Sequence, residues 1–260
     1  MPTLFFEIFG SLLGLLLGSF ANVLVLRDDR RASIVTGRSE CPNCKQLLTW
    51  YELVPVISFL ILRGRCRSCG KPISWQYPLV ELVSSGLWLF ATYYGFVLHG
   101  SLLAAVFLGL CLSALLVISV IDIRTQMVAA EYCIVAGLLG GFASLTLGVP
   151  VVSLVIGFLA GGGLLAVVLL GWKRLTGQDG MGEGDVWIAA SLGLAAGWPL
   201  IGVALLFAVL LGSFIGVGYA VLSKQGFKIR IPFGPFLAIG FVGALAWGQM
   251  VLSWYILQLR

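Results

Sequence analysis

Long apolar runs separated by short polar segments dominate the hydrophobic pattern of this chain. About eight runs approach the ~20 residues that cross a hydrocarbon core as a helix. They cover roughly residues 4–26, 79–98, 102–121, 127–147, 151–172, 186–197, 200–222 and 231–256. The sixth run is the shortest. The pattern predicts an all-α polytopic membrane protein of about eight transmembrane helices.

The composition agrees with this prediction. Hydrophobic residues make up 60% of the 260 residues and charged residues only 10%, and the mean hydropathy is +1.05. These values exclude a soluble globular domain and a disordered chain. In a membrane protein the net charge of +5 is better explained by topology than by binding to nucleic acid, which we do not expect as a partner.

The basic residues predict the orientation. Residues 1–7 carry no Lys or Arg, and Arg27, Arg30 and Arg31 follow the first apolar run, which is the wrong charge order for a signal peptide. With the N-terminus outside, the inside segments are 27–78, the turn at Arg124, 173–184 and 223–230. These segments hold 15 of the 16 Lys and Arg residues, as the positive-inside rule requires.

The polar segment 27–78 contains two Cys-x-x-Cys pairs, Cys41/Cys44 and Cys66/Cys69, with 21 residues between them. This spacing is typical of a four-thiolate structural zinc site. Disulfides are not expected in a reducing cytosol, and a redox dithiol or an iron site remains an alternative. The expected zinc fastens a loop too small to fold alone. Between the pairs, the apolar stretch 50–60 is too short to span the bilayer, and we expect it at the membrane interface.

Acidic residues inside apolar runs are costly and are therefore candidate functional residues. They are Glu7, Glu81, Asp122, Glu131 and Asp185. Asp122 ends the third run and Asp185 opens the sixth, so both lie at a similar depth on the inner side. Two such carboxylates can share a proton as an aspartic dyad, in which one acts as base and the other as acid. Alternatively, Asp122 pairs with Arg124 and Asp185 caps a helix.

Several motifs occur in an order that resembles one family, the bacterial type IV prepilin peptidases, which are intramembrane aspartic proteases. The motifs are Gly18-Ser-Phe-Ala-Asn-Val23, Cys41-x-x-Cys44, Trp50-Tyr-Glu-Leu-Val-Pro-Val56, Leu62-Arg-Gly-Arg-Cys66, Cys69-Gly70, Tyr77-Pro-Leu-Val-Glu-Leu82, Gly180-Met-Gly-Glu-Gly-Asp185 and Ile231-Pro-Phe-Gly-Pro-Phe236.

The resemblance implies an endopeptidase of the bacterial inner membrane. Such an enzyme cuts the basic leader of prepilins and pseudopilins after a Gly at the cytoplasmic face. It implies catalysis by Asp122 and Asp185, zinc on Cys41, Cys44, Cys66 and Cys69, and a second, S-adenosylmethionine-dependent methylation of the new N-terminus. Glu81 and the cytoplasmic loop are the expected neighbourhood for methylation.

The chain departs from the family pattern at two places. Ala129 and Ala130 stand where the family has Pro and an acid, with Glu131 one place later, and Trp187 stands where a Lys is common. The predicted domains are a first helix over 1–26, a zinc-binding loop domain with four cysteine ligands over 27–78 and a seven-helix protease core over 79–260. Oligomeric state is not predicted.

Two other functions remain open at this point. One is a proton-coupled membrane transporter with the zinc loop as a cytoplasmic gate. We find no internal repeat in the sequence to support it. The other is a zinc-loop scaffold without catalysis.

Overall fold

The computed structural model describes residues 2–30, 38–177, 181–222 and 231–258. These residues form helices and loops, and the only β-type pairing among them is two isolated bridges. The chain divides into two compact units, Met1–Val117 and Ile118–Arg260, and the boundary falls inside helix α4 (Leu102–Thr125).

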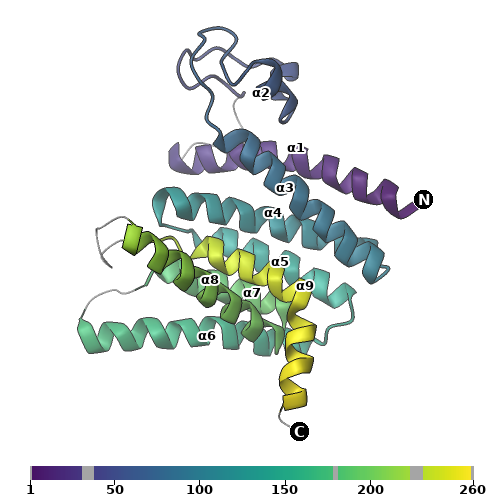
Figure 1. The fold of residues 1–260 in the computed structure, drawn as a ribbon, viewed down its shortest axis with the longest axis vertical. Coiled ribbons are helices and arrows are strands. Elements are labelled where there is room, and N and C mark those ends of the chain that lie inside the picture. The colour runs from purple at the N-terminus through teal and green to yellow at the C-terminus, as the bar shows by residue number, and fades with distance from the viewer. Residues whose placement is uncertain (1, 31–37, 178–180, 223–230, 259–260) are drawn as a thin grey trace. The chain divides into compact units, whose positions relative to one another are not determined.

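The first unit is built on the helix pair α1 (Pro2–Arg30) and α3 (Gln76–Thr92). A π-helical segment, η2 (Tyr93–Leu98), continues α3, so together they account for the predicted run 79–98. Between α1 and α3 lies an insert with only two short helices, η1 (Trp50–Leu53) and α2 (Ile57–Ile61). Figure 1 shows this insert as irregular chain projecting beyond α1 and α3.

Glycines let α1 and α3 approach closely. Gly10, Gly14 and Gly18 share one face of α1, and a β-carbon on any of them would collide with α3. At Gly14, for example, it would lie 2.7 Å from the carbonyl oxygen of Ser84. Close packing of small residues is a common means of helix association in membranes, and here it operates within one chain.

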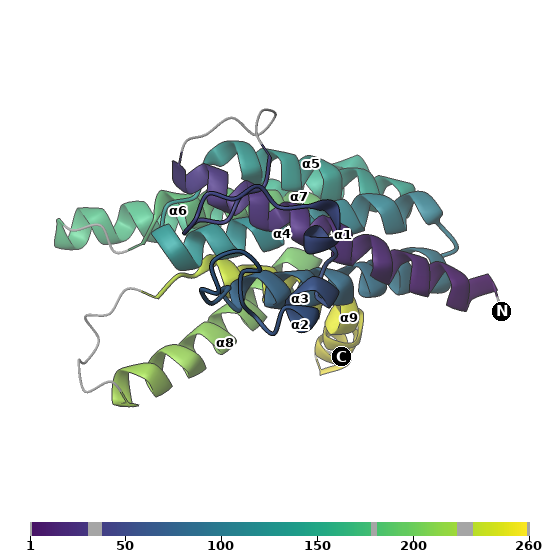
Figure 2. The ribbon, with the colours of Figure 1, turned by 90° about the horizontal axis from the view of Figure 1, so that it is seen from above.

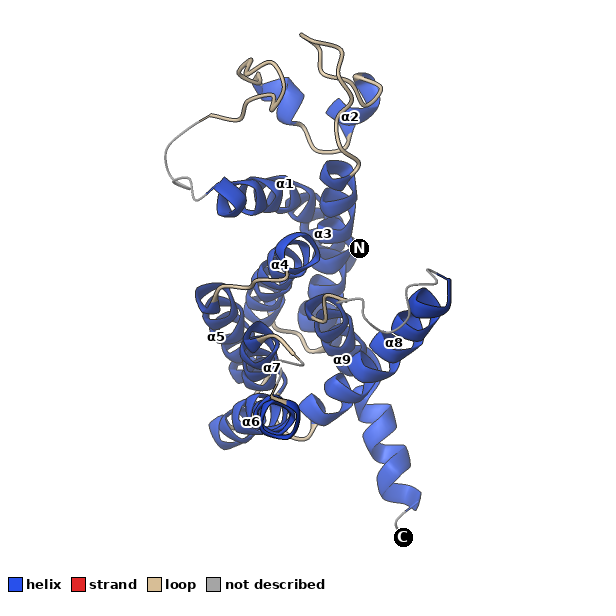
Figure 3. Cartoon of the chain, turned by 90° about the vertical axis from the view of Figure 1, so that its left-hand side faces the viewer, coloured by secondary structure: helices blue, strands red, loops and turns tan. Residues whose placement is uncertain are grey.

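The second unit contains α5 (Ala130–Thr146), α6 (Val151–Thr176), α7 (Glu183–Ala196), α8 (Leu200–Leu222) and α9 (Gly234–Gln258). Helix α7 packs between α5 and α6, as Figure 3 shows, while α8 packs on α9. In Figure 2, α8 diverges from α6, so that the C-terminal end of α8 lies away from that helix. Large apolar side chains remain exposed on α6 and α8, including Leu175 of α6 at 86% and Phe214 of α8 at 81%. Such exposure is expected for surfaces that face lipid.

Five of the described helices are long and apolar enough to cross a membrane: α1, α4, α6, α8 and α9. Helices α3, α5 and α7 have 17, 17 and 14 residues and are shorter than a full span. The protein is therefore a helical, multi-pass membrane protein. The count of about eight spans and the division into 1–26, 27–78 and 79–260 stay predictions.

Candidate active site and metal centre

Asp122 lies in the last turn of α4 and is almost completely buried, with 6% of its surface exposed. The helix ends just beyond it, where Gln126 adopts a left-handed conformation (φ 53°). The Thr125 hydroxyl then donates to the Met127 carbonyl oxygen at 3.1 Å. These contacts order the turn that leads into α5. The side chain of Asp122 is thus held at a helix terminus, as the sequence predicted.

Asp185 lies in the first turn of α7 and is partly buried. Its carboxylate lies beside the backbone of Gly182, the N-cap residue of its own helix, so a capping role remains compatible with the structure. A β-carbon on Gly184 would lie 3.3 Å from that of Val128 in the α4–α5 turn. This glycine therefore permits a close approach between α7 and the α4–α5 turn, while Gly180 lies outside the described residues.

The start of α9 links these two positions. The backbone N–H of Gly234 donates to Oδ2 of Asp122 at 2.9 Å. A β-carbon on Gly234 would also come within 3.1 Å of Ile188, which lies one turn after Asp185 on α7. The carboxylates of Asp122 and Asp185 interact electrostatically. Residues 63 positions apart in the sequence thus belong to one acidic site within the second unit.

The departures from the family pattern lie close to this site. Ala129 is the N-cap of α5 without a capping side chain, and Glu131 lies in the first turn, where a negative charge is favourable. Cys133 is fully buried and interacts electrostatically with Asp185 and Glu131. Trp187 is 45% exposed on α7. Nothing in the structure explains why these residues replace the family's usual ones.

The insert places its four cysteines together. The Sγ atoms of Cys41, Cys44, Cys66 and Cys69 lie within 4.8 Å of one another, and none forms a disulfide. The Cys41–Cys69 and Cys44–Cys66 Sγ distances are both 4.0 Å. Tetrahedral zinc with bonds of ~2.3 Å requires sulfur separations of about 3.8 Å. The residues present therefore fit a zinc ion.

Each cysteine pair sits on the same local fold, a knuckle. In the first knuckle the N–H of Cys41 donates to the Gln46 carbonyl oxygen at 2.9 Å, and Lys45 donates back to Cys41 at 2.9 Å. The second repeats these bonds between Cys66 and Lys71 and between Gly70 and Cys66. The chain turns through left-handed residues at equivalent places, Lys45 (φ 59°) and Gly70 (φ 68°). A hydrogen bond from the backbone of Cys44 lowers the pKa of the Cys41 thiol to about 7. Despite a backbone hydrogen bond from Gln46 that lowers it, desolvation and the neighbouring cysteines raise the pKa of the Cys44 thiol to about 11, so Cys41 forms the thiolate that a metal binds more readily than Cys44 does.

A strained turn joins the insert to the helix pair. Val56 has φ 59° and ψ −48°, and the N–H of Ile57 donates to the Pro55 carbonyl oxygen across it, which makes a γ-turn. This conformation is unfavourable for a β-branched residue. The N–H of Val56 donates to Oε2 of the buried Glu81 on α3 at 2.8 Å, and Ser19 of α1 also bonds this carboxylate. Glu81 thus fastens the insert to both helices.

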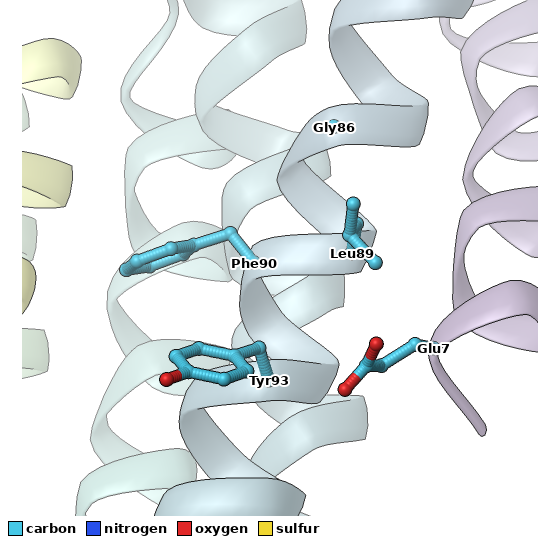
Figure 4. A pocket seen from close by; sticks show the side chains of 5 residues that line it. All are labelled: Glu7, Gly86, Leu89, Phe90 and Tyr93. Carbon is cyan, nitrogen blue, oxygen red and sulfur yellow. The ribbon is translucent and has the colours of Figure 1, made fainter. Parts of the chain in front are cut away.

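The remaining intramembrane acid is Glu7 on α1. It lines an open cavity of about 320 Å³ together with Gly86, Leu89, Phe90 and Tyr93. Figure 4 shows its carboxylate directed toward α3, whereas the rings of Phe90 and Tyr93 extend from the other side of that helix. No catalytic partner of Glu7 is evident among the described residues of this cavity.

Comparison with known proteins places the chain in a family. Residues 12–95 match the bacterial peptidase A24 N-terminal domain, and residues 109–221 match the type IV leader peptidase family. The chain belongs to the type IV leader peptidase family. The second match contains both Asp122 and Asp185, whereas the Gly234 contact lies beyond it.

Relatives of this leader peptidase family align over nearly the whole chain. A prepilin leader peptidase/N-methyltransferase of Aeromonas hydrophila is 34% identical over 98% of this chain and 95% of its own length. Proteins of the same name from Burkholderia pseudomallei and Bacillus subtilis are 36% and 33% identical, covering 95% and 94% of this chain and 87% and 95% of their own lengths. No solved structure matches the chain. The family resemblance is confirmed, and these relatives do not favour a transporter.

Proposed function

We propose that this chain is a membrane aspartic endopeptidase that removes the leader from type IV prepilins and pseudopilins and methylates the new N-terminus. Membership of the leader peptidase family and the names of its relatives support both activities. The observation that carries the catalytic assignment is the meeting of Asp122 and Asp185 in one acidic site. We assign the dyad to these two residues.

The dyad performs acid–base chemistry on a peptide bond. One carboxylate takes a proton from water, and the resulting hydroxide attacks the scissile carbonyl carbon. The other carboxyl group, protonated, donates to the carbonyl oxygen. The proton taken from water is then delivered to the leaving nitrogen as the C–N bond breaks, and the second carboxylate recovers its proton from the intermediate as the carbonyl re-forms. A buried Asp122 at a helix terminus suits this role because few water molecules compete for its carboxylate.

We place the protein in the bacterial inner membrane with about eight spans, its N-terminus outside and its dyad at the cytoplasmic face. The positive-inside distribution supports this orientation. Helix α3 with η2 extends over 76–98, which supports counting it as a full span. The sixth span is the short, largely buried α7. Arg31 and the basic residues of 223–230 lie outside the described residues.

The insert supplies the zinc site and contacts the membrane surface. Cys41, Cys44, Cys66 and Cys69 would hold a closed, structural zinc that supplies stability rather than a reactive water. Trp50 and Tyr51, which are 79% and 42% exposed, suit a position at headgroup depth. Methylation uses S-adenosylmethionine, and we assign its neighbourhood to Glu81 and this insert.

Different interactions bind the substrate on the two sides of the cleaved bond. Its apolar helix lies in the lipid beside the spans, and its basic leader faces acids on the inner side. Among the described side chains these acids are Glu40, Glu52 and Glu183. Asp28 and Asp29 belong to the end of α1 but their side chains are not described, and Asp179 lies outside the described residues. Neutralising these acids is expected to weaken cleavage at low salt.

One assay tests the proposal. A prepilin is incubated with the full chain and S-adenosylmethionine, and mass spectrometry reads the cut and the added methyl group. We expect Asp122→Asn and Asp185→Asn each to reduce cleavage by at least about a thousandfold and to leave methylation of an already shortened pilin intact. Glu7→Gln, another intramembrane acid, serves as the matched control and should cleave normally. Efficient cleavage by either Asn variant would refute the dyad.

A further inference from the structure

Outside the two acids, one backbone contact reaches the site from a third helix. The N–H of Gly234, at the first residue of α9, donates to Oδ2 of Asp122 at 2.9 Å. The two residues are 112 positions apart, so this bond is tertiary. Gly234 is itself buried. Bonds from N–H groups to a carboxylate are stronger than bonds between neutral groups, and they fix its orientation.

Glycine leaves room at this position for the Asp122 carboxylate in its observed orientation. A β-carbon there would lie 2.8 Å from Oδ2 of Asp122 and 3.1 Å from Cδ1 of Ile188. Both atoms are ends of side chains that can rotate. An alanine at 234 would therefore be accommodated by turning the Asp122 carboxylate away, rather than by separating the helices.

Another glycine of the same helix behaves differently. A β-carbon on Gly240 would collide with the backbone of α8, where it would lie 2.9 Å from the nitrogen of Ala208. Backbone atoms cannot rotate aside, so Gly240 serves helix packing. The missing side chain at Gly234 therefore affects the orientation of the Asp122 carboxylate, whereas the missing side chain at Gly240 affects the packing of α9 on α8. The two glycines lie within two turns of each other.

We propose that Gly234 is a positioning residue of the dyad: its N–H holds the Asp122 carboxylate toward the reacting water, and its lack of a side chain leaves room for that orientation. This inference rests on the proposed function. It adds that α9 takes part in catalysis through its backbone, although it supplies no reacting group.

The charged and titratable groups around the dyad come from several elements. Asp185 and Glu183 lie on α7, Glu131 and Cys133 on α5, and Arg124 on α4. None of them lies on α9, so a substitution at 234 changes the environment of Asp122 without removing a charge. A change in pH dependence can then be assigned to the lost N–H contact.

The test compares Gly234→Ala with two matched variants in the full chain. We expect Gly234→Ala to lower kcat for prepilin cleavage about a hundredfold, with little change in KM and in thermal stability. The acidic limb of its kcat/KM profile should move about one unit toward higher pH, because the hydrogen bond that is lost when the carboxylate turns away favoured its ionised form. Gly240→Ala should lose thermal stability, and Gly202→Ala, which meets no atom within 4 Å, should behave as wild type.

A double variant separates positioning from packing. Ile188→Val removes the second atom that a side chain at 234 would meet. If Gly234→Ala/Ile188→Val regains full kcat, the loss came from packing and the proposal is overturned. Wild-type kcat in Gly234→Ala overturns it as well. If Asp122→Asn retains activity, the proposed dyad itself fails, which is a distinguishable result.

Discussion

The insert over 38–75 and the α6–α7 helix pair are held together by different interactions. Both hold together segments that are distant in the sequence. The insert has little regular structure and leaves Trp50, Ile61 and Trp75 more than 70% exposed, and its two knuckles meet at four sulfur atoms. The helix pair contains no such cluster among its described residues and meets through backbone.

In the helix pair, the contact depends on missing side chains. A β-carbon on Gly157 would collide with the carbonyl oxygen of Gly193, and one on Gly161 with that of Ala189. Each helix therefore presents small residues four positions apart to the other, which allows close van der Waals packing. The insert depends on which atoms its side chains carry, and the helix pair depends on how little space they occupy.

Removing the proposed zinc should have the largest effect on stability, and the effect should be confined to the insert. Structural zinc contributes roughly 10–16 kcal/mol to the folding of small zinc peptides, more than the insert can recover from its exposed side chains. We expect chelation or Cys44→Ser to open 38–75 to limited proteolysis. Metal analysis should find about one zinc per chain in wild type and in the control Cys111→Ala, and none in Cys44→Ser. Unchanged protection without zinc would contradict this.

A side chain placed in the α6–α7 contact should cause the second largest loss of stability. Gly193→Ala is expected to cost ~1–3 kcal/mol, as other overpacked interiors do, because the new β-carbon meets the backbone of Gly157. Thermal unfolding in detergent measures the loss. Gly202→Ala on α8 is the control, since its β-carbon meets nothing within 4 Å. Equal stability of the two variants would show that the close approach is not needed.

The smallest expected loss of stability comes from disrupting the capping box at the start of η1. The Thr49 hydroxyl and backbone N–H donate to Oε2 of Glu52 at 2.6 and 2.8 Å, and they lower the pKa of that carboxyl. Its stabilising contribution is therefore present above the unfolded pKa of ~4.3 and is lost as the pH falls through the lower, folded value. Thr49→Val should cost about 1 kcal/mol at pH 7.

Hydrogen exchange of the insert against pH checks this prediction. Protonation of the cysteines affects wild type and Thr49→Val alike, so their difference isolates the Glu52 contribution. That difference should shrink as the pH falls through the folded pKa of Glu52. A difference that stays constant down to low pH would contradict the assignment.

Much of this organisation was predictable because it is encoded in spacing. The two Cys-x-x-Cys pairs stand out by their spacing, and the positions of Asp122 and Asp185 at helix ends follow from where apolar runs end and begin. The Val56 γ-turn and the Gly234–Asp122 bond were not predicted. The Ile231–Phe236 motif is visible in the sequence, but every residue except proline has a backbone N–H, so the motif does not show which N–H binds Asp122. A Val in a strained conformation likewise depends on a partner, Glu81, that lies 25 positions away.

The repeated knuckles also have a consequence for biosynthesis. Cys41 and Cys44 leave the ribosome before Cys66 and Cys69, and each knuckle has its own hydrogen bonds. A metal ion can therefore bind to the first pair before the second pair has been synthesised. Binding of the second pair then closes the intervening loop, just before α3 begins at Gln76. With the proposed zinc bound there, zinc supply would set when the segment between α1 and α3 becomes a finished unit. Chains made during zinc starvation would carry an open, protease-sensitive segment between two inserted helices.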